Sequence, residues 1–331
     1  MIYYIINNDF HIYNVQNHIS LSNELDFTII RIPYSLNSDC KSFAENIITI
    51  ETPFRERKKF WNPKFFYAAK ARIDKIPFKE EDLIIFLTEY DPLNQYIVYK
   101  SKEKGATIHL LEEGISFYAI YLHDNKLTRN YKYLIKLFYL RYLIGFHFFK
   151  YVAVGNMNFP QIKDKYIDKI LLYFDVEVSR NINVEIISNN AIGYADLKKD
   201  TAAFLSQPLY ESYMSLPSYI KHVSYQLDKI INNYSRVYFK FHPRESDAFK
   251  NLIKLRFFDK VIFIENQILE DFIEEYRPLV AFSFFSDALF KLKSKGLKVR
   301  FLYSGVDELK NKRYLRNISN IVKQLEKDSE K

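Results

Sequence analysis

The sequence predicts an α/β protein of two domains, each built around a parallel sheet. Short apolar runs alternate with longer segments of helical periodicity along the whole chain, which is the pattern of βαβ units. The 331 residues suffice for two domains at roughly 150 residues each. Hydrophobic residues make up 48% of the chain, with only 7 Gly and 10 Pro, so a large core can form and long flexible linkers are few.

The candidate strands fall into two series. In the first half they are Tyr3–Ile6, Phe27–Ile32, Ile47–Ile50, Leu83–Leu87, Thr107–Leu111 and Tyr151–Val154. In the second half they are Ala203–Ser206, Val237–Phe241, Val261–Ile264, Leu279–Ser283 and Val299–Tyr303. A polar stretch at Asn189–Lys199 separates the two series, as a domain boundary does. We therefore expect two Rossmann-like domains, one over residues 1–190 and one over residues 191–331.

The composition excludes several kinds of site. Cys40 is the only cysteine, so neither an intrachain disulfide nor a cysteine-based zinc site can form. The sequence has no Walker loop, no GxGxxG after a strand and no convincing metal-ligand set, and we expect neither a metal nor a cofactor. Six histidines are scattered, and we expect most of them at the surface or at the edge of the core. They are His11, His18, His109, His123, His147 and His222.

The charge and the apolar pattern bear on partners and location. The formal net charge of +8 favours an anionic partner, which could be a charged nucleotide, an acidic membrane surface or nucleic acid. The first residues, Met1–Asp9, lack the basic leader of a signal peptide. No stretch approaches the about 18 uncharged apolar residues of a membrane span. We expect a cytoplasmic protein that is soluble or peripheral on a membrane.

The first of three polar motifs follows the candidate strand Thr107–Leu111. It consists of Glu112, Glu113 and Gly114. Because ligands of a parallel sheet bind at the carboxyl ends of strands, a carboxylate here could act as a general base on a hydroxyl. Glycine permits a sharp turn and close approach by a ligand. The simpler interpretation is a solvated turn or acids at the start of a helix.

The other two motifs follow strands of the second half. Pro243 biases His242 towards extended geometry and ends the strand Val237–Phe241, so His242 should stand at its tip beside two cations. There it could protonate or hydrogen-bond a leaving phosphate. Ser283 and Ser286 bracket the end of another strand, where hydroxyls and a helix N-terminus could hold the phosphate. An ordinary turn histidine and a simple helix cap are the alternatives.

The segment Leu127–Lys150 stands apart because it is rich in Tyr, Phe and Leu and has no acidic residue. It carries the cations Arg129, Lys132, Lys136, Arg141 and Lys150. One interpretation is a half-buried helix with solvated cations, which the sequence slightly favours. The other is an interfacial helix that meets anionic lipid.

Taken in order, the three motifs resemble those of bacterial sialyltransferases, which share an acid-acid-Gly motif, a His-Pro motif and a downstream Ser/Thr motif. The nearest similarity is to the lipooligosaccharide sialyltransferases of glycosyltransferase family 52. Segments like Leu205–Leu209, Tyr238–Glu245 and Phe282–Leu289 occur in that family. The similarity covers the second half best, and the first half mainly through Glu112–Gly114.

The resemblance implies a GT-B fold, with two Rossmann-like domains facing a central cleft. It also implies an inverting, metal-independent transfer of sialic acid from CMP-sialic acid to a bacterial surface glycan. Glu113 would be the base on the acceptor side and His242 would assist the leaving phosphate, while Glu211, which follows the Gln-Pro-Leu segment, is the alternative base. The residues implied in donor binding are Glu112, Gly114, Lys240, Pro243, Arg244, Glu270 (to the ribose), Ser283 and Ser286.

Two other interpretations remain open at this point. A near alternative keeps the reaction but changes the donor to another CMP-activated nonulosonate or to CMP-Kdo. An alternative of a different class is a basic, non-enzymatic protein that binds a membrane or nucleic acid, although it leaves the three motifs unexplained. The enzyme hypothesis predicts a glycan acceptor, which could be lipid-linked at the inner face of the bacterial inner membrane, and no nucleic acid. A homodimer is compatible with it.

Overall fold

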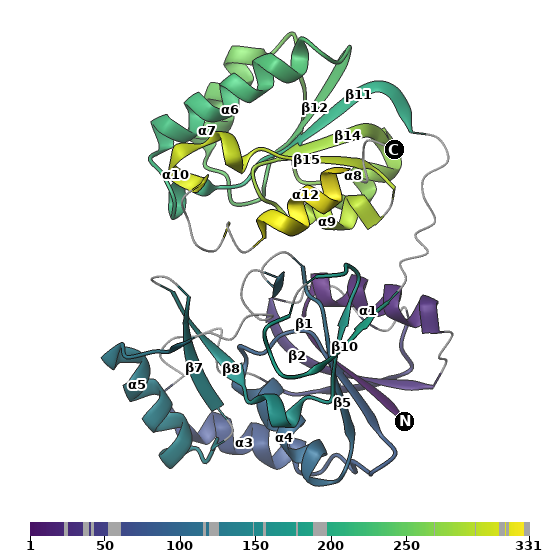
Figure 1. Cartoon of the computed structure of the whole chain (residues 1–331), viewed down its shortest axis with the longest axis vertical. Coiled ribbons are helices and arrows are strands. Elements are labelled where there is room, and N and C mark those ends of the chain that lie inside the picture. The colour runs from purple at the N-terminus through teal and green to yellow at the C-terminus, as the bar shows by residue number, and fades with distance from the viewer. Residues whose placement is uncertain are drawn as a thin grey trace. The chain divides into compact units, whose positions relative to one another are not determined.

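The structure is a computed structural model of the chain that divides into two compact units, unit 1 from Met1 to Asn189 and unit 2 from Asn190 to Lys331 (Figure 1). The polar segment in which the sequence places the domain boundary lies mostly outside the described residues. The structure describes residues 1–22, 26–35, 40, 43–51, 61–114, 117–118, 126–147, 149–154, 157–176, 178–187, 197–267, 269–294, 296–310, 315 and 318–327.

Unit 1 is built on a seven-stranded parallel sheet with the order β10-β9-β5-β4-β1-β2-β3. The chain runs outward from β1 to β3 and then returns to β4 on the other side of β1. This reversal makes a topological switch point, outside which ligands of such sheets bind. The strands are β1 (Ile2–Asn8), β2 (Phe27–Ser35), β3 (Asn46–Thr49), β4 (Leu83–Phe86), β5 (Thr107–Leu111), β9 (Lys169–Leu172) and β10 (Asn183–Ile186).

Helices cover this sheet because alternate strand residues point to opposite faces. Tyr4 and Ile6 of β1 belong to a buried cluster with Ile12 and Val15 of helix α1 (Asp9–Ser22). Tyr3 points the other way and meets Phe78 edge to face, with ring centroids 5.3 Å apart. Two further helices in the described part of this unit are α3 (Pro63–Ile73) and α4 (Pro92–Glu103). Both begin with Pro behind a capping Asn or Asp, which fits the unpaired first N–H groups of a helix.

The expectation that Tyr151–Val154 joins the parallel sheet is wrong. This run forms β7 (Phe149–Val154) in a separate antiparallel sheet with β6 (Lys126–Leu127) and β8 (Met157–Ile162). The physical reason is the connection, because the two residues between β7 and β8 suffice for a hairpin but not for a parallel crossover. The short strands β9 and β10, which the sequence pattern did not reveal, complete the main sheet instead.

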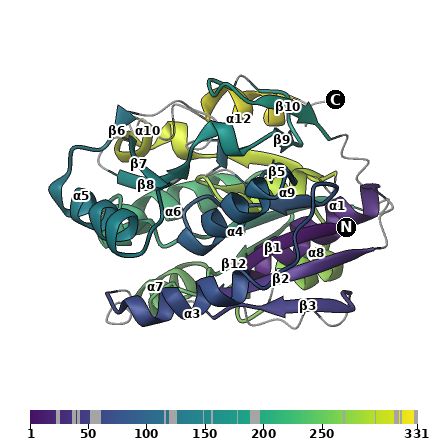
Figure 2. The ribbon, with the colours of Figure 1, turned by 90° about the horizontal axis from the view of Figure 1, so that it is seen from below.

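The helix expected over Leu127–Lys150 is shorter than predicted. Asn130 caps the start of α5 (Tyr131–Phe138), its side chain accepting from the N–H of Lys132. A π-helical turn, Tyr139–Leu143, continues α5, and the chain then turns at Gly145, whose φ of 85° suits glycine. Figure 2 shows α5 at the edge of unit 1 beside β7 and β8.

Unit 2 contains a five-stranded parallel sheet with the order β13-β12-β11-β14-β15. Its strands are β11 (Lys198–Leu205), β12 (Arg236–Lys240), β13 (Ile262–Ile264), β14 (Pro278–Ser283) and β15 (Lys298–Phe301), and they match the five that the sequence predicts. Its helices among the described residues are α6 (Leu216–Ile231), α7 (Asp247–Phe257), α8 (Leu269–Tyr276), α9 (Asp287–Ser294), α10 (Asp307–Lys310) and α12 (Ser319–Lys327). Among the residues that the structure describes, no helix combines the length and the apolar character needed to cross a bilayer.

Candidate active-site residues in the two units

Glu113 stands at the carboxyl edge of the unit 1 sheet, two residues beyond β5. Its Oε1 lies 2.9 Å from Nε2 of His11, which is in the first turn of α1. Nδ1 of His11 accepts a hydrogen bond from the backbone N–H of Asn7 at 3.1 Å. A neutral imidazole has one donor and one acceptor nitrogen, so its proton must be on Nε2, directed at Glu113. The His11 side chain is fully buried, whereas that of Glu113 is 18% exposed.

His11 was not recognised as a site residue from the sequence. We expect most of the six scattered histidines at the surface or at the edge of the core, and His11 is an exception. It is fully buried in the first turn of α1, directly against the acid-acid-Gly motif. The only local signal was its place, a few residues beyond the end of β1. Such positions gather at the same edge of a parallel sheet as the end of β5.

The neighbouring acid, Glu112, has a different environment. Its side chain is buried and accepts a hydrogen bond from the backbone N–H of Tyr173 at 2.7 Å. Burial raises the pKa of Glu112 to about 8, and the bond from Tyr173 offsets only part of that increase. The two adjacent acids are therefore divided: Glu112 packs inward between β5 and the end of β9, and Glu113 remains accessible.

The turn itself is held in place by local contacts. Gly114 has a φ of 138°, a conformation that L side chains rarely adopt, so the glycine of the motif is needed for the turn. The side-chain amide of Asn14, on α1, donates to the carbonyl of Glu112 at 3.4 Å. The turn after β5 is thus tied to the same helix that carries His11.

A buried amide pair supports the end of β1. Nδ2 of Asn7 donates to Oδ1 of Asn94 at 3.0 Å, and Nδ2 of Asn94 returns a bond to Oδ1 of Asn7 at 2.8 Å. Asn94 also donates to the carbonyl of Thr88, just beyond β4. All three residues are fully buried. Because the N–H of Asn7 is the partner of His11, this pair fixes the backbone from which the imidazole is oriented.

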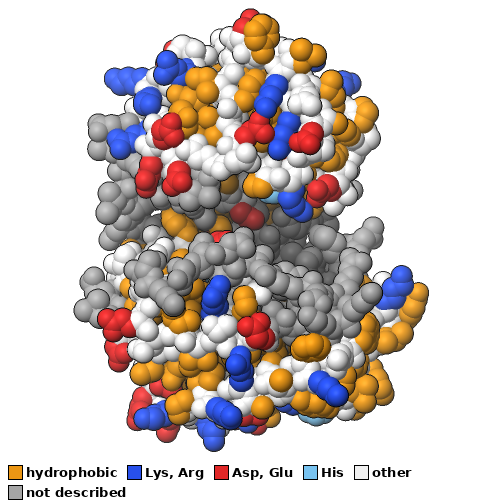
Figure 3. All heavy atoms as spheres, turned by 180° about the vertical axis from the view of Figure 1, so that it is seen from behind, with side chains coloured by type: hydrophobic (Ala, Val, Ile, Leu, Met, Phe, Trp, Pro, Cys, Tyr) orange, Lys and Arg blue, Asp and Glu red, His pale blue; other side chains and the backbone are white. Residues whose placement is uncertain are grey.

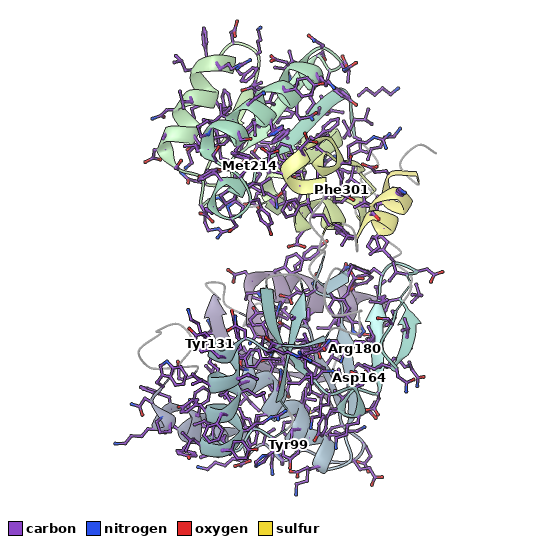
Figure 4. All side chains as sticks on the ribbon, turned by 60° about the vertical axis from the view of Figure 1, so that its left-hand side comes forward. Tyr99, Tyr131, Asp164, Arg180, Met214 and Phe301 are labelled. Carbon is purple, nitrogen blue, oxygen red and sulfur yellow. The ribbon has the colours of Figure 1, made fainter. Side chains whose placement is uncertain are left out.

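A buried ion-pair cluster lies beyond the end of β4. Arg180 reaches Glu89 with a bidentate pair of bonds of 2.7 and 3.3 Å, and it also contacts Asp164 at 2.9 Å. Figure 4 shows Arg180 and Asp164 next to one another. The side chains of Arg180 and Glu89 are 2% and 0% exposed. Glu89 also accepts from the N–H of Ile162, so the cluster connects the antiparallel β-sheet to the main one.

In unit 2, a pocket of about 510 Å³ opens at the carboxyl ends of β11 and β12. Three of the residues predicted from the His-Pro motif line it, namely Lys240, His242 and Pro243, together with Ser286 of the serine motif. The fold therefore brings side chains from two separate sequence motifs into one cavity. Its other lining residues are Leu205, Ser206, Phe241, Asn266, Gln267, Leu269 and Ala288.

His242 has a defined tautomer in this pocket. Its Nδ1 accepts from the backbone N–H of Arg244 at 3.1 Å, so the proton of the neutral ring is on Nε2. Burial lowers the pKa of His242, and the nearby charges of Arg244 and Lys240 lower it further. The negative charge of Glu211 raises the pKa of His242 but only partly offsets these effects. At neutral pH the ring is a neutral donor facing a cationic neighbourhood, which suits an anionic ligand.

A buried network supports the His-Pro turn, and its members were not assigned roles from the sequence. The N–H of His242 donates to Oγ of Ser206 at 2.9 Å. Tyr219 donates from its hydroxyl to Glu245 at 3.1 Å and accepts from the N–H of Gln207 at 3.1 Å. Burial raises the pKa of Glu245, while hydroxyl donors including Ser206 lower it. Gln207 and Glu245 lie in two of the segments that resemble the sialyltransferases, so the sequence carried a signal for this network.

The two serines of the third motif differ in position. Ser283 is fully buried, and its hydroxyl donates to the carbonyl of Leu205 at 2.8 Å, joining β14 to β11. Ser286 lines the pocket and caps α9, its Oγ accepting from the N–H of Ala288 at 3.2 Å. Between them the N–H of Phe285 donates to Gln207. Ser286 is therefore positioned to meet a ligand, and Ser283 shapes the loop that presents it.

The remaining predicted residues are placed as follows. Glu211 ends a 3₁₀ turn, Leu209–Glu211, and pairs with Arg244 at 3.2 Å on an exposed part of unit 2. Glu270 is the second residue of α8, and its side chain lies outside the described residues. Among the described residues, no group of three His, Cys, Asp or Glu side chains could hold a metal ion.

Comparison with known proteins gives a family match over most of the chain. The model of a family described as alpha-2,8-polysialyltransferase (POLYST) matches residues 4–294. A search of curated protein sequences finds no match. The resemblance to sialyltransferases is thereby confirmed at the level of the activity, while the narrower assignment to glycosyltransferase family 52 is not.

Three solved structures with a similar fold are the following. The UDP-GlcNAc 2-epimerase from Methanocaldococcus jannaschii has a TM-score of 0.52 at 10% identity, covering 96% of this chain and 91% of that one. S. aureus MnaA, solved with UDP, has a TM-score of 0.50 at 12% identity, covering 98% and 89%. A putative UDP-N-acetylglucosamine 2-epimerase from Listeria monocytogenes has a TM-score of 0.50 at 10% identity, covering 99% and 88%. At such identities the likeness shows the fold, which is α/β of GT-B type with two Rossmann-like domains.

Proposed function

The chain belongs to the alpha-2,8-polysialyltransferase family, and from this premise we propose that it transfers sialic acid from CMP-sialic acid to a glycan hydroxyl with inversion. That it is a sialyltransferase-like enzyme follows from the family. The donor, the residues that act on it and the absence of a metal requirement are the proposal. The observation that carries it is the unit 2 pocket, in which a histidine with its proton on Nε2 stands among cationic and hydroxyl side chains.

The donor part of the proposal rests on charge and hydrogen bonding in that pocket. The leaving group of CMP-sialic acid is a phosphate, whose negative charge grows as the glycosidic bond breaks. Lys240 contributes positive charge, His242 donates from Nε2, and Ser286 with the start of α9 offers donors to the phosphate oxygens. We assign Ser283 to holding the loop, because its hydroxyl is bonded to Leu205.

The acceptor part assigns the general base to Glu113. Its carboxylate takes the proton of the acceptor hydroxyl, the hydroxyl oxygen bonds to the anomeric carbon, and the bond from that carbon to the phosphate breaks. The electron pair leaves with the phosphate, which His242 stabilises by hydrogen bonding or protonation. Glu211 remains the alternative base, but its ion pair with Arg244 competes with that role. The family description favours a sialic acid hydroxyl as the acceptor.

The proposal includes no metal and no cofactor, and it places the acceptor on a bacterial surface glycan, such as a lipid-linked chain at the inner face of the cytoplasmic membrane. Activity should therefore persist in EDTA. Loss of activity on chelation, restored by magnesium or manganese, would show that a cation takes over the charge that we assign to His242 and Lys240.

The test is nucleotide binding followed by transfer. Calorimetry with CMP, UMP and GDP should show preferential binding of CMP, and His242→Ala should weaken it. Incubation with CMP-sialic acid and a sialylated oligosaccharide should then lengthen the acceptor by one or more sialic acids, as read by mass spectrometry. If transfer occurred only from CMP-Kdo, the donor sugar in the proposal would change and the mechanism would stand. Preferential binding of GDP or UMP would refute a CMP-activated donor.

A further inference from the structure

Unit 1 carries an exposed apolar face on α5 that the transfer reaction does not use. Its aromatic and aliphatic residues recur at a spacing that places them on one side of the helix and its π-helical extension, and each is 44–67% exposed. These residues, which we call the α5 face, are Tyr131, Leu134, Ile135, Phe138 and Tyr142. Most large apolar residues of a soluble protein are covered, so a contiguous set of this kind marks an interaction surface.

The α5 face extends onto a second helix that is distant in sequence. Tyr67 of α3 donates from its hydroxyl to the carbonyl of Leu143 at 2.5 Å, and Lys70 donates to the carbonyl of Ile144 at 2.8 Å. The Trp61 ring lies 5.0 Å from that of Tyr139. Trp61 and Tyr67 are themselves 48% and 50% exposed. The apolar surface is therefore a platform made by two helices and fixed to the fold.

The charged side chains of the segment that carries the α5 face are of one sign, and of them Lys150 pairs with Asp164 at 3.8 Å. From Asn125 to Lys163 the sequence contains no Asp or Glu. The cations in this stretch are Lys126, Arg129, Lys132, Lys136, Arg141, Lys150 and Lys163. Figure 3 shows orange and blue side chains together along the right-hand edge of unit 1, the edge that α5 occupies in the opposite view. Long basic side chains beside an apolar face can reach lipid headgroups while the face enters the acyl boundary.

We propose that the α5 face and its cations form a binding surface for an anionic lipid bilayer. A second copy of this chain fits less well, because a symmetric contact through the same face would bring cations against cations. Aromatic rings, aliphatic side chains and flanking Lys and Arg are the combination that binds at a bilayer interface. The surface belongs to unit 1 and the pocket residues belong to unit 2, so bilayer binding and CMP binding can be measured with separate sets of variants.

The experiment is co-sedimentation of the full chain with vesicles of phosphatidylcholine with and without phosphatidylglycerol. We expect binding to the anionic vesicles, reversed by high salt. Ile135→Ser with Phe138→Ser should lower vesicle affinity by at least about tenfold, because exposed apolar area is removed. Changing Lys132, Lys136 and Arg141 to Glu should abolish binding at low salt.

Matched controls come from unit 2. Leu255→Ser with Phe258→Ser removes two apolar side chains from another helical surface, which at 76% each are more exposed than Ile135 and Phe138 at 57% and 59%. Changing Lys221, Arg236 and Lys260 to Glu reverses three exposed cations. Both should bind vesicles like the wild type, while CMP affinity stays unchanged in all four variants. The proposal would be overturned if the α5 variants bound anionic vesicles as strongly as the wild type. The proposal would also be overturned if the wild type had no vesicle affinity and light scattering showed a dimer that the α5 variants dissociate.

A second, independent observation concerns Glu113, and it rests on the proposed role of Glu113 as the base. We infer that His11 is the positioning residue of this carboxylate. One carboxylate oxygen is held by Nε2–H of His11, while the 18% exposure of Glu113 leaves it accessible to a substrate. The imidazole cannot rotate freely, since Nδ1 is held by Asn7 and the backbone N–H of His11 is bonded to Asn8.

Three substitutions test this inference by steady-state kinetics. His11→Leu should lower kcat about 10²-fold with KM for the donor and CMP affinity unchanged, because a displaced base costs reaction geometry. His11→Gln, whose amide can donate from a similar position, should recover a large part of that loss. His11→Leu added to Glu113→Gln should lower kcat no further than Glu113→Gln alone, since residues that act as a unit are not additive.

The outcomes separate this inference from the proposed function. Full activity of His11→Leu alongside an inactive Glu113→Gln would refute the positioning role and leave Glu113 as the base. Full activity of Glu113→Gln would refute both. A further loss in the double variant would show that His11 acts elsewhere, and thermal unfolding of each variant identifies any loss due to misfolding.

Discussion

The carboxyl edges of the two parallel sheets have the same strand-to-helix arrangement and differ in the side chains that gather there. In unit 1 they are acidic residues, with Glu89, Glu112 and Glu113 following two strands of the sheet. Glu89 is paired with Arg180 and burial raises the pKa of Glu112, so Glu113 is the accessible carboxylate. In unit 2 the edge gathers positive and neutral donors, with Lys240 as the last residue of β12 and His242 following it. With the roles that we propose, the same strand-then-helix architecture presents a proton acceptor in one unit and a site for an anion in the other. The fold supplies the location, and a few side chains at strand ends decide the chemistry.

The largest effect is expected when the carboxylate of unit 1 is removed. Glu113→Gln should lower kcat by about 10²–10⁴-fold, the usual contribution of a general base, while CMP affinity stays the same. His242→Ala should also lower kcat severely, but it should weaken CMP binding as well because His242 lines the pocket. Single-turnover kinetics with calorimetry separates the two. If Glu211→Gln proves more damaging than Glu113→Gln, the base belongs to unit 2 and the contrast between the edges fails.

These same residues show how much of the candidate site the sequence predicts. Apolar periodicity located the ends of β5, β12 and β14, and so placed Glu113, His242 and Ser286 at carboxyl edges. It could not show that His11 meets Glu113, because the contact spans 102 residues and depends on the order of strands in the sheet. Nor could it show that Ser283 is buried while Ser286 lines the pocket, since that depends on Leu205 and the neighbouring strand.

The buried ion pair of unit 1 and the exposed ion pair of unit 2 should differ in how much stability is lost when one partner is removed. Arg180→Met leaves Glu89 buried without its cation and should destabilise the protein by about 3–5 kcal/mol. Arg244→Met breaks an exposed pair with Glu211 and should cost at most about 1 kcal/mol. Denaturant unfolding measures both. Equal losses would mean that the Glu89 cluster is solvated in solution.

The buried Glu112 predicts a pH dependence of stability with a definite sign. Its pKa is about 8 in the fold against 4.5 for the free side chain, so the unfolded chain releases this proton first. The stability that protonation supports is complete below about pH 4.5 and is lost as the pH rises through 8. Glu112→Gln, which keeps the acceptor for the N–H of Tyr173, should therefore unfold at a higher temperature than the wild type at pH 8.5 and at nearly the same temperature at pH 5. A constant difference at both pH values would exclude this titration.

The smallest effects should divide the two serines of unit 2. Ser286→Ala removes one hydroxyl from the pocket and should weaken CMP binding by about 1 kcal/mol, roughly fivefold, the value of a typical hydrogen bond. Ser283→Ala leaves the carbonyl of Leu205 without that donor, so it should lower the free energy of unfolding by about 1 kcal/mol and leave CMP affinity unchanged. Calorimetry and denaturant unfolding on the same two proteins provide the measurement, and each variant is the control for the other. If Ser283→Ala weakens CMP binding and Ser286→Ala does not, the phosphate lies deeper along β14 than the pocket lining indicates, and the hydroxyl of Ser283 must turn away from Leu205 when the nucleotide binds.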